Sequence, residues 1–130
     1  MASKGIHLLC LLFSLAWIVL ETEADNYGTL KKKHWDYPRT TPPKGVSYCN
    51  YMMKSRRINY LRFNIFIHAS EHQLKNICPK YDDGEWTTDN PFSITTCTGH
   101  VDDYSTTRST IMIVVFCRKG LPIEFRALAP

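Results

Sequence analysis

The stretch Thr110–Phe125, TIMIVVFCRKGLPIEF, decides the fold of this chain. It opens with a run of β-branched apolar residues that is too short to cross a bilayer and too rich in Ile and Val for a surface helix. A basic turn containing Gly120 follows, and apolar residues then alternate with Pro122 and Glu124. This pattern predicts a buried β-hairpin with Cys117 on one arm and Glu124 on the other.

The N-terminal segment has the layout of a secretory signal peptide. Lys4 precedes an apolar stretch of about 15 residues, shorter than the ~20 residues that a membrane-spanning helix needs. The small residue Ala24 offers a cleavage site. We therefore expect residues 1–24 to be removed and residues 25–130 to form a single secreted, extracellular domain without a membrane span. A retained signal anchor is the alternative.

Charge and cysteine content describe the expected mature domain. Removal of residues 1–24 leaves 15 basic and 10 acidic residues out of 16 and 12, a formal charge of +5. So small a core gives only a thin margin of stability. The remaining cysteines are Cys49, Cys78, Cys97 and Cys117. An even number in a secreted domain predicts two disulfides with three possible connectivities. The sequence lacks the short Cys-x-x-Cys spacing that is typical of zinc ligands, and we expect neither a metal nor a cofactor.

The remaining segments predict helices first and strands later. Helices are expected within residues 25–36, 48–56 and 70–78, and strands at 63–68, 92–97 and 102–110. Ser47 is the expected N-cap of the second helix, and Ser70 begins the third. Residues 81–90 are polar and rich in turn formers, so we expect a loop there. The combination predicts an α+β domain with an antiparallel sheet.

Several short segments resemble landmarks of the pancreatic-type ribonuclease (ribonuclease A) family. They are Tyr48–Met53, Phe66–His68, Lys75–Cys78, Ser93–Cys97 and Ile113–Cys117. They occur in the family's order and cover essentially the whole expected mature chain. The resemblance implies a ribonuclease A-like fold, with three short N-terminal helices packed on a curved antiparallel sheet.

The resemblance also implies a disulfide pattern. Cys49 would pair with Cys97, and Cys78 would pair with Cys117. The family's other half-cystines are missing on both sides of each absent bond, and Tyr60 stands where one of them would be. Each retained bond closes a long loop and should stabilise the fold by about 4 kcal/mol.

The family cleaves RNA with two imidazoles and one lysine, which move protons and stabilise the charge that develops on the phosphate. By the resemblance, His34 matches the first imidazole. Leu61 occupies the position of the lysine, and Glu124 occupies that of the second imidazole. Ile65 replaces the threonine that reads a pyrimidine edge. The resemblance therefore implies a catalytically degenerate member in which His34 is the sole retained, vestigial match.

Two residues could substitute for the missing groups. Arg62 is cationic and adjoins Leu61, but neighbouring side chains on a strand point to opposite faces. A glutamic acid such as Glu124 is ordinarily ionised at neutral pH, so it lacks the proton to donate and would repel the RNA phosphate. We therefore expect no enzyme activity. His68, in a strand, is expected to be structural.

Basic residues form a second group of candidates. They are Lys31, Lys32, Lys33, Lys54, Arg56 and Arg57. They belong to the first two predicted helices, which flank one lobe of the family's fold. A shared anion-binding patch there would bind RNA weakly, or glycans and cell surfaces that carry negative charge. The alternative is an ordinary solvated face.

These expectations favour a secreted, monomeric, non-catalytic ribonuclease-like protein that acts by binding. The chain is similar to the epididymal ribonuclease-like secretory proteins, which implies a male-tract role in sperm coating or maturation with the sperm surface as partner. One alternative is a weak pyrimidine-type endoribonuclease that uses His34. The other is a cationic host-defence (antimicrobial) protein, suggested by the +5 charge.

Overall fold

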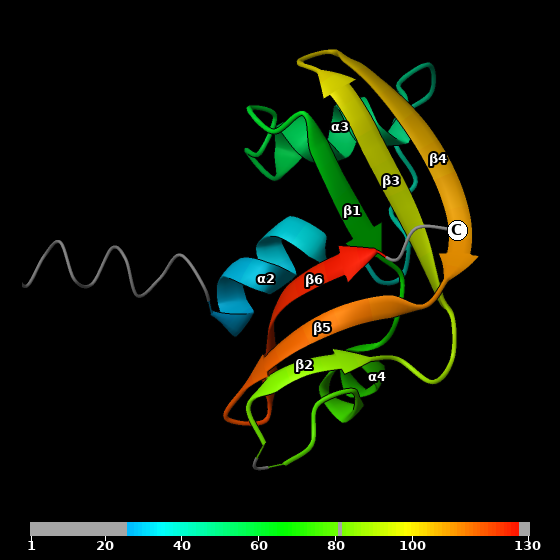
Figure 1. Cartoon of the computed structure of the whole chain (residues 1–130). Coiled ribbons are helices and arrows are strands. Elements are labelled where there is room, and N and C mark those ends of the chain that lie inside the picture. The colour runs from blue at the N-terminus through cyan, green and yellow to red at the C-terminus, as the bar shows by residue number, and fades with distance from the viewer. Residues whose placement is uncertain (1–25, 81, 128–130) are drawn as a thin grey trace, which may run out of the picture.

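The computed structural model describes residues 26–80 and 82–127, so the predicted signal peptide lies outside the described residues. The helices are α2 (Tyr27–His34), α3 (Tyr48–Ser55) and α4 (Glu71–Asn76). The strands are β1 (Phe63–Ile67), β2 (Gly84–Thr87), β3 (Phe92–His100), β4 (Asp103–Ile111), β5 (Ile113–Arg118) and β6 (Leu121–Ala127). They form two antiparallel sheets, of order β1-β3-β4 and β2-β5-β6 (Figure 1). The α+β class is confirmed.

Polar caps begin all three described helices. The Asn26 side chain accepts a hydrogen bond from the backbone of α2. The Ser47 hydroxyl accepts one from the Asn50 amide at 3.2 Å, as the sequence predicts. Ser70 and Gln73 form a reciprocal capping box, in which each side chain accepts a hydrogen bond from the other's backbone N–H. These caps supply acceptors for backbone donors that a short helix cannot satisfy itself.

The predicted C-terminal hairpin is confirmed. β5 and β6 pair with Arg118 opposite Leu121, so the turn consists of Lys119 and Gly120. Both turn residues have positive φ, 54° and 76°, which matches the twist of two-residue hairpin turns. Buried apolar side chains on both arms, Phe125 among them, fasten the hairpin into the core.

Two expectations about the strands need correction. The hairpin begins at Ile113, because Ile111 ends β4 and pairs with Phe92 in the other sheet. The chain thus changes sheets at Met112. The expected loop at 81–90 contains β2, which pairs with β5 from Gly84 to Thr87. β2 is an edge strand with mostly exposed residues, so hydrogen bonds to β5 rather than its own hydrophobic pattern hold it.

Two buried clusters make up the core. One gathers apolar side chains of α2, α4 and the sheet β2-β5-β6, together with Ile65 and Ile67 of β1. The other lies between α3 and the sheet β1-β3-β4, and includes Met52, Met53 and Phe66. β1 contributes to both clusters because its successive side chains face opposite sides of the strand.

Each cluster contains one disulfide. Cys78–Cys117 joins the end of α4 to β5 in the first cluster, and Cys49–Cys97 joins α3 to β3 in the second. Both pairings implied by the family resemblance are confirmed. The covalent links therefore hold two helices on two different sheets.

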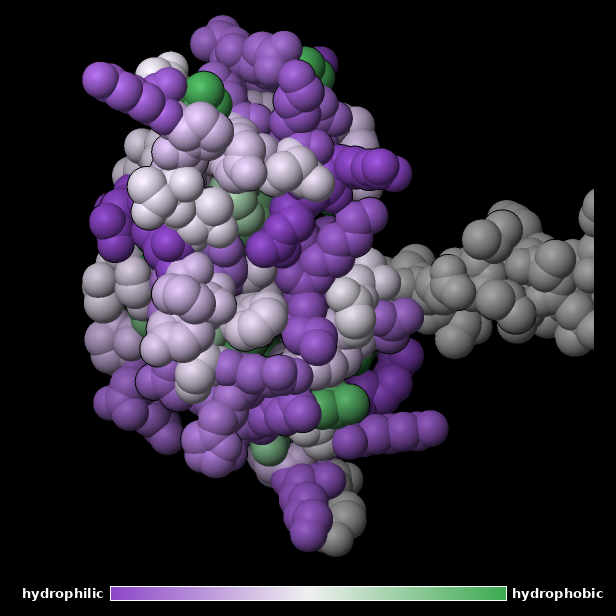
Figure 2. Space-filling model, turned by 180° about the vertical axis from the view of Figure 1, so that it is seen from behind, coloured by the Kyte–Doolittle hydropathy of each residue, from purple (hydrophilic) through white to green (hydrophobic). Residues whose placement is uncertain are grey.

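Hydrophilic side chains and side chains of intermediate hydropathy cover the face of the molecule shown in Figure 2. On the face shown in Figure 2, hydrophobic residues appear only as small, separate areas. Among the residues that the structure describes, no helix has the length and hydropathy needed to cross a bilayer.

Candidate functional site

One cleft of about 330 Å³ brings together the residues singled out by the sequence: His34, Leu61, Ile65 and Glu124 all line it. They come from the end of α2, the turn before β1, β1 itself and β6. These elements meet because α2 lies beside β1 and β6 (Figure 1). We call this the His34 cleft.

His34 is held in a defined orientation. Its Nδ1 lies 2.9 Å from the Ile65 carbonyl oxygen, which can only accept, so Nδ1 carries the proton and donates it. The ring meets Phe125 edge-on, with ring centroids 6.1 Å apart. The Asn64 amide donates to the Lys33 carbonyl at 2.8 Å and holds the end of α2 against β1. These contacts leave Nε2 of the neutral ring available to accept a proton.

The environment favours the neutral form of His34. Burial lowers the pKa of the imidazole below its ordinary value, the hydrogen bond to Ile65 opposes this, and the charge of Lys33 lowers it further. At neutral pH the ring is therefore uncharged. Such a group can serve as a base, the role that the family resemblance assigns to it.

The rest of the His34 cleft is largely apolar. Leu61 and Phe63 both line it, and Phe63 is 59% exposed. Arg62, the substitute cation considered from the sequence, is exposed and is not among the residues that line the cleft. This placement is consistent with the expectation that the Arg62 side chain points to the opposite face from its sequence neighbours.

Two charged residues of β6 also line the cleft. The Arg126 guanidinium is 3.0 Å from the Glu85 carboxylate and lies over the Phe116 ring. Glu124 is exposed, and the described part of the chain offers it no ion pair or hydrogen bond. The residue that the resemblance matches to the second imidazole is thus an exposed carboxylate that lines a largely apolar cleft.

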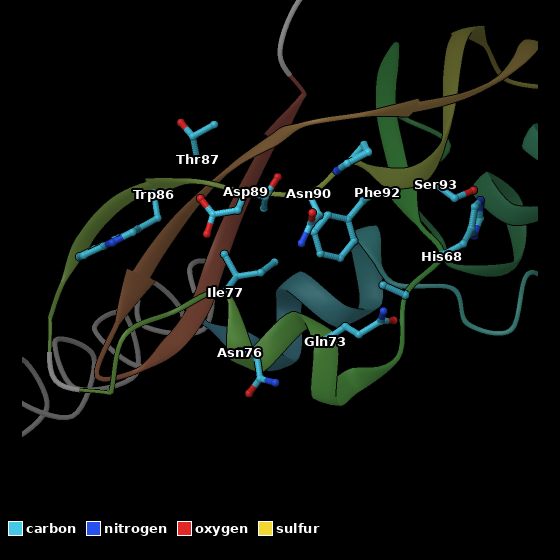
Figure 3. Close-up of a pocket in the computed structure, with 13 residues that line it drawn as sticks. His68, Gln73, Asn76, Ile77, Trp86, Thr87, Asp89, Asn90, Phe92 and Ser93 are labelled. Carbon is cyan, nitrogen blue, oxygen red and sulfur yellow. The ribbon is translucent and has the colours of Figure 1, made fainter.

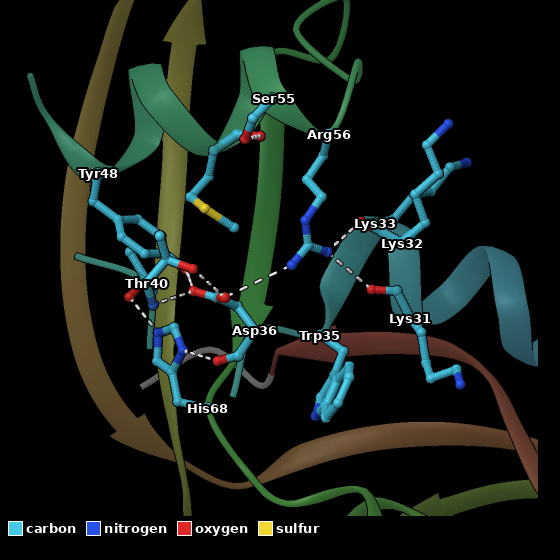
Figure 4. A network of polar contacts seen from close by, with 12 residues as sticks. Lys31, Lys32, Lys33, Trp35, Asp36, Thr40, Tyr48, Ser55, Arg56 and His68 are labelled. Carbon is cyan, nitrogen blue, oxygen red and sulfur yellow. Dashed lines mark hydrogen bonds and ion pairs between the residues drawn. The ribbon is translucent and has the colours of Figure 1, made fainter. Parts of the chain in front are cut away.

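A buried polar network next to the His34 cleft was not foreseen from the sequence. Asp36 accepts hydrogen bonds from the Thr40 backbone at 2.9 Å, the Thr40 hydroxyl at 2.6 Å and the Tyr48 hydroxyl at 2.6 Å. Its carboxylate also lies 3.6 Å from Arg56 (Figure 4). Burial raises the pKa of Asp36, but these donors and the nearby cation hold it below its usual value overall. An aspartate two residues after His34 was the only available signal.

His68 lies in the same network, and the expectation that it is structural fits its contacts. Its Nδ1 donates to the Asp36 carbonyl at 2.8 Å, and its Nε2 accepts from the Thr95 hydroxyl at 2.7 Å. Burial lowers the pKa of the ring, while Asp36 opposes the shift and Arg39 and Arg108 add to it. Both nitrogens are engaged, so this imidazole joins β1, β3 and the segment after α2.

The predicted anion-binding patch is corrected at two positions. The Arg56 guanidinium donates to the carbonyls of Lys31 and Lys32 at the end of α2 and pairs with Asp36, so this partly exposed cation is engaged within the protein (Figure 4). The Lys31 ammonium lies 3.4 Å from Glu71 on α4.

The other patch members have different environments. Lys33 lines the His34 cleft. Lys32, Lys54 and Arg57 are exposed. Arg56 brings the C-terminal ends of α2 and α3 together, as the shared patch requires, but the accessible cations are fewer than the sequence suggested.

Metal binding finds no support among the described ranges 26–80 and 82–127. They contain no group of three or more His, Cys, Asp or Glu side chains arranged to hold an ion.

Comparison with known proteins gives the family. Residues 25–126 match the family of pancreatic ribonuclease, and the chain belongs to that family. A ribonuclease of Chelonia mydas is 32% identical over 113 residues, covering 76% of this chain and 94% of the relative. A ribonuclease homolog of Gallus gallus is 31% identical over 113 residues, covering 80% and 81%.

Solved structures agree with this assignment. The crystal structure of green turtle egg white ribonuclease superposes with a TM-score of 0.68 at 32% identity, covering 78% of this chain and 98% of the other. Among the relatives compared by sequence, the angiogenin of Chlorocebus aethiops is 29% identical over 135 residues, covering 92% of this chain and 91% of the relative. The ribonuclease A-like fold is confirmed.

Proposed function

We propose that this chain is a secreted ribonuclease-like protein that acts by binding and not by cleaving RNA. One observation carries the proposal: the His34 cleft contains a single imidazole, and it is also lined by Leu61 and Glu124, the residues that the family resemblance matches to the lysine and the second imidazole. Secretion is supported by the sequence of residues 1–24 and by membership of the family.

The chemistry of the cleft supports the proposal. Transfer of a proton to the leaving oxygen requires an acid, which is an imidazole in the family's mechanism, whereas the cleft presents the carboxylate of Glu124. Its negative charge disfavours binding of the RNA phosphate. Leu61 has no positive charge with which to stabilise the negative charge that develops on the phosphorane. Such electrostatic stabilisation is usually among the largest contributions to the rate of these reactions. Loss of one proton-transfer group alone lowers rates by about 10²–10⁴.

The experiment is an RNA-cleavage assay on protein purified from the medium of cells that express the full chain. We expect no turnover above background from the wild type. The double variant Leu61→Lys/Glu124→His should gain activity, because both new groups would line the same cleft as His34. Adding His34→Ala should abolish that gain. Wild-type turnover close to that of an intact family member would overturn the proposal.

A weak ribonuclease is the second candidate, and the neutral, oriented His34 favours it. It would use His34 as base, with Arg62 and Glu124 as imperfect substitutes. It predicts a trace activity that His34→Ala removes. A trace that survives this substitution would be contamination, and would leave binding as the function.

The proposed partners are anionic: cell-surface glycans, the sperm surface or RNA bound weakly. The exposed cations Lys32, Lys54 and Arg57 support this part of the proposal, as does the +4 formal charge of the whole chain. Retention on heparin should weaken as the salt concentration rises. It should also weaken in the triple variant Lys32→Ala/Lys54→Ala/Arg57→Ala. Salt-independent retention would count against an electrostatic partner.

Similarity to epididymal proteins supports a male-tract role, which antibody staining of epididymis and sperm would test. Salt-sensitive bacterial killing would instead favour host defence.

A further inference from the structure

A second cavity, of about 430 Å³, lies between α4 and the segment that leads from β2 into β3 (Figure 3). It shares no lining residue with the His34 cleft. Its volume is within the ~300–1,000 Å³ typical of small-molecule sites. The binding function proposed above leaves this cavity unused.

Three large apolar side chains take part in the lining of this cavity. Ile77, directly after α4, and Phe92 of β3 extend toward each other from the two sides, and Trp86 of β2 lies at one end (Figure 3). All three are partly buried and pack against the first core cluster. The core therefore holds in place the apolar surface that a ligand would meet.

Uncommitted polar groups surround that surface. Asp89 and Asn90 are exposed, line the cavity on the side opposite α4, and have no hydrogen-bond partner among the described residues. Gln73 is oriented because its side-chain oxygen accepts from the Ser70 amide at 2.9 Å, which leaves its NH₂ group free to donate. A carboxylate accepts only, whereas amides both donate and accept, so the rim offers both kinds of hydrogen bond.

The charge of this cavity differs from that of the whole chain. No lysine or arginine lines it, although the chain carries a formal charge of +4. His68 reaches it, but both ring nitrogens are engaged inside the protein. Asp89 is the one formally charged side chain among the lining residues. Phosphate, sulfate and carboxylate ligands are therefore disfavoured, in contrast to the exposed cations elsewhere.

We propose that this cavity binds a neutral saccharide. A sugar ring has a C–H face that packs against apolar and aromatic side chains, and hydroxyls that donate as well as accept hydrogen bonds. Phe92 and Ile77 would contact the C–H face. Asp89, Asn90 and Gln73 would bind the hydroxyls. The site goes beyond the proposed function, since it needs neither the cleft nor the cationic residues.

The test is saturation-transfer NMR and calorimetry on the secreted protein, with mannose, galactose, N-acetylglucosamine and lactose as probes. At least one should bind in the millimolar range, with affinity that does not depend on salt. Asp89→Ala should lower this affinity at least about tenfold, because it removes a charged hydrogen-bond acceptor. Asp103→Ala removes the same charge at an exposed position on the distant β3–β4 hairpin, and should change affinity less than about twofold.

Three results would overturn the proposal. One is the lack of binding by every neutral probe at tens of millimolar. Another is equal binding by wild type and Asp89→Ala. The third is binding limited to sialic acid or heparin fragments and lost in salt, which would indicate the exposed cations instead. Failure here would leave the RNA-cleavage result unaffected, because the two sites are separate.

Discussion

At the scale of single residues, Arg56 shows how tertiary contacts change the role of a charge. The sequence placed it in a surface patch with Arg57, one position further on. In the structure it binds two carbonyls at the end of α2 and the carboxylate of Asp36, which is only 4% exposed. A cation at a helix C-terminus satisfies carbonyls that have no partner within the helix. Arg56 is therefore part of the frame that holds His34.

Replacing Arg56 with Met should lower the free energy of unfolding by about 1–3 kcal/mol, since it leaves a buried carboxylate and helix carbonyls with fewer partners. Arg57→Met is the matched control, because Arg57 is exposed and should change stability by less than about 0.5 kcal/mol. Urea denaturation measures both. Equal effects of the two variants would mean that the Arg56 contacts add no stability.

Two histidines make stability depend on pH. Burial lowers the pKa of His34 and His68 in the folded protein, so below about pH 6.5 the unfolded chain binds more protons than the folded one. The free energy of unfolding should be highest above pH ~6.5 and fall toward acid, by up to about 1.4 kcal/mol per pH unit for each residue. Denaturation at a series of pH values tests this. An unchanged slope in His34→Gln/His68→Gln would contradict it.

At the scale of elements, turns and caps were easier to predict than strand limits. Ser47 and Ser70 begin helices because their side chains can bond the backbone in any protein, which is a local property. β2 was missed because its partner β5 lies about 30 residues away, and pairing of that kind leaves no local pattern. The predicted hairpin starts at Thr110 instead of Ile113, because Thr110 and Ile111 are β-branched like the residues of β5 that follow them.

The β3–β4 hairpin depends on Gly99. Its φ is +142°, and a Cβ atom there would lie 2.3 Å from the Asp103 carbonyl oxygen, so Gly99→Ala combines a disfavoured φ with a backbone clash. Gly45→Ala is the control, since Gly45 also has positive φ, +84°, but open space around it. We expect Gly99→Ala to destabilise by at least about 2 kcal/mol more than Gly45→Ala. Equal melting temperatures would show that the hairpin relaxes around the new methyl group.

At the scale of the whole molecule, the two disulfides stabilise two separate clusters. They close loops with sequence separations of 48 and 39 residues, and each joins a helix to a sheet. Because loops of this length are flexible in the unfolded chain, closing them reduces its conformational entropy. The pairing could not be derived by counting cysteines, since three connectivities were open, and it followed only from the family resemblance.

Removing either disulfide should be severe. Cys49→Ala/Cys97→Ala and Cys78→Ala/Cys117→Ala should each lower the free energy of unfolding by about 4 kcal/mol, a large part of the total for a domain of this size. The yield of secreted protein and the denaturation midpoint measure the effect. A loss below about 1 kcal/mol for either pair would show that the packed cluster holds the helix without the covalent link.

The sequence by itself determined the α+β class, two helix caps and the C-terminal hairpin, and it singled out Leu61 and Glu124 as residues that the resemblance matches to catalytic groups. Each depends on local chemistry or on matching residues in order. Tertiary structure alone decided that α2, β1 and β6 bring His34, Leu61 and Glu124 into one cleft. It also decided that Arg56 is engaged in contacts within the protein, and that Asp89 and Asn90 line a cavity together with residues of α4. These depend on contacts between distant segments, which the packing of two sheets and three helices sets.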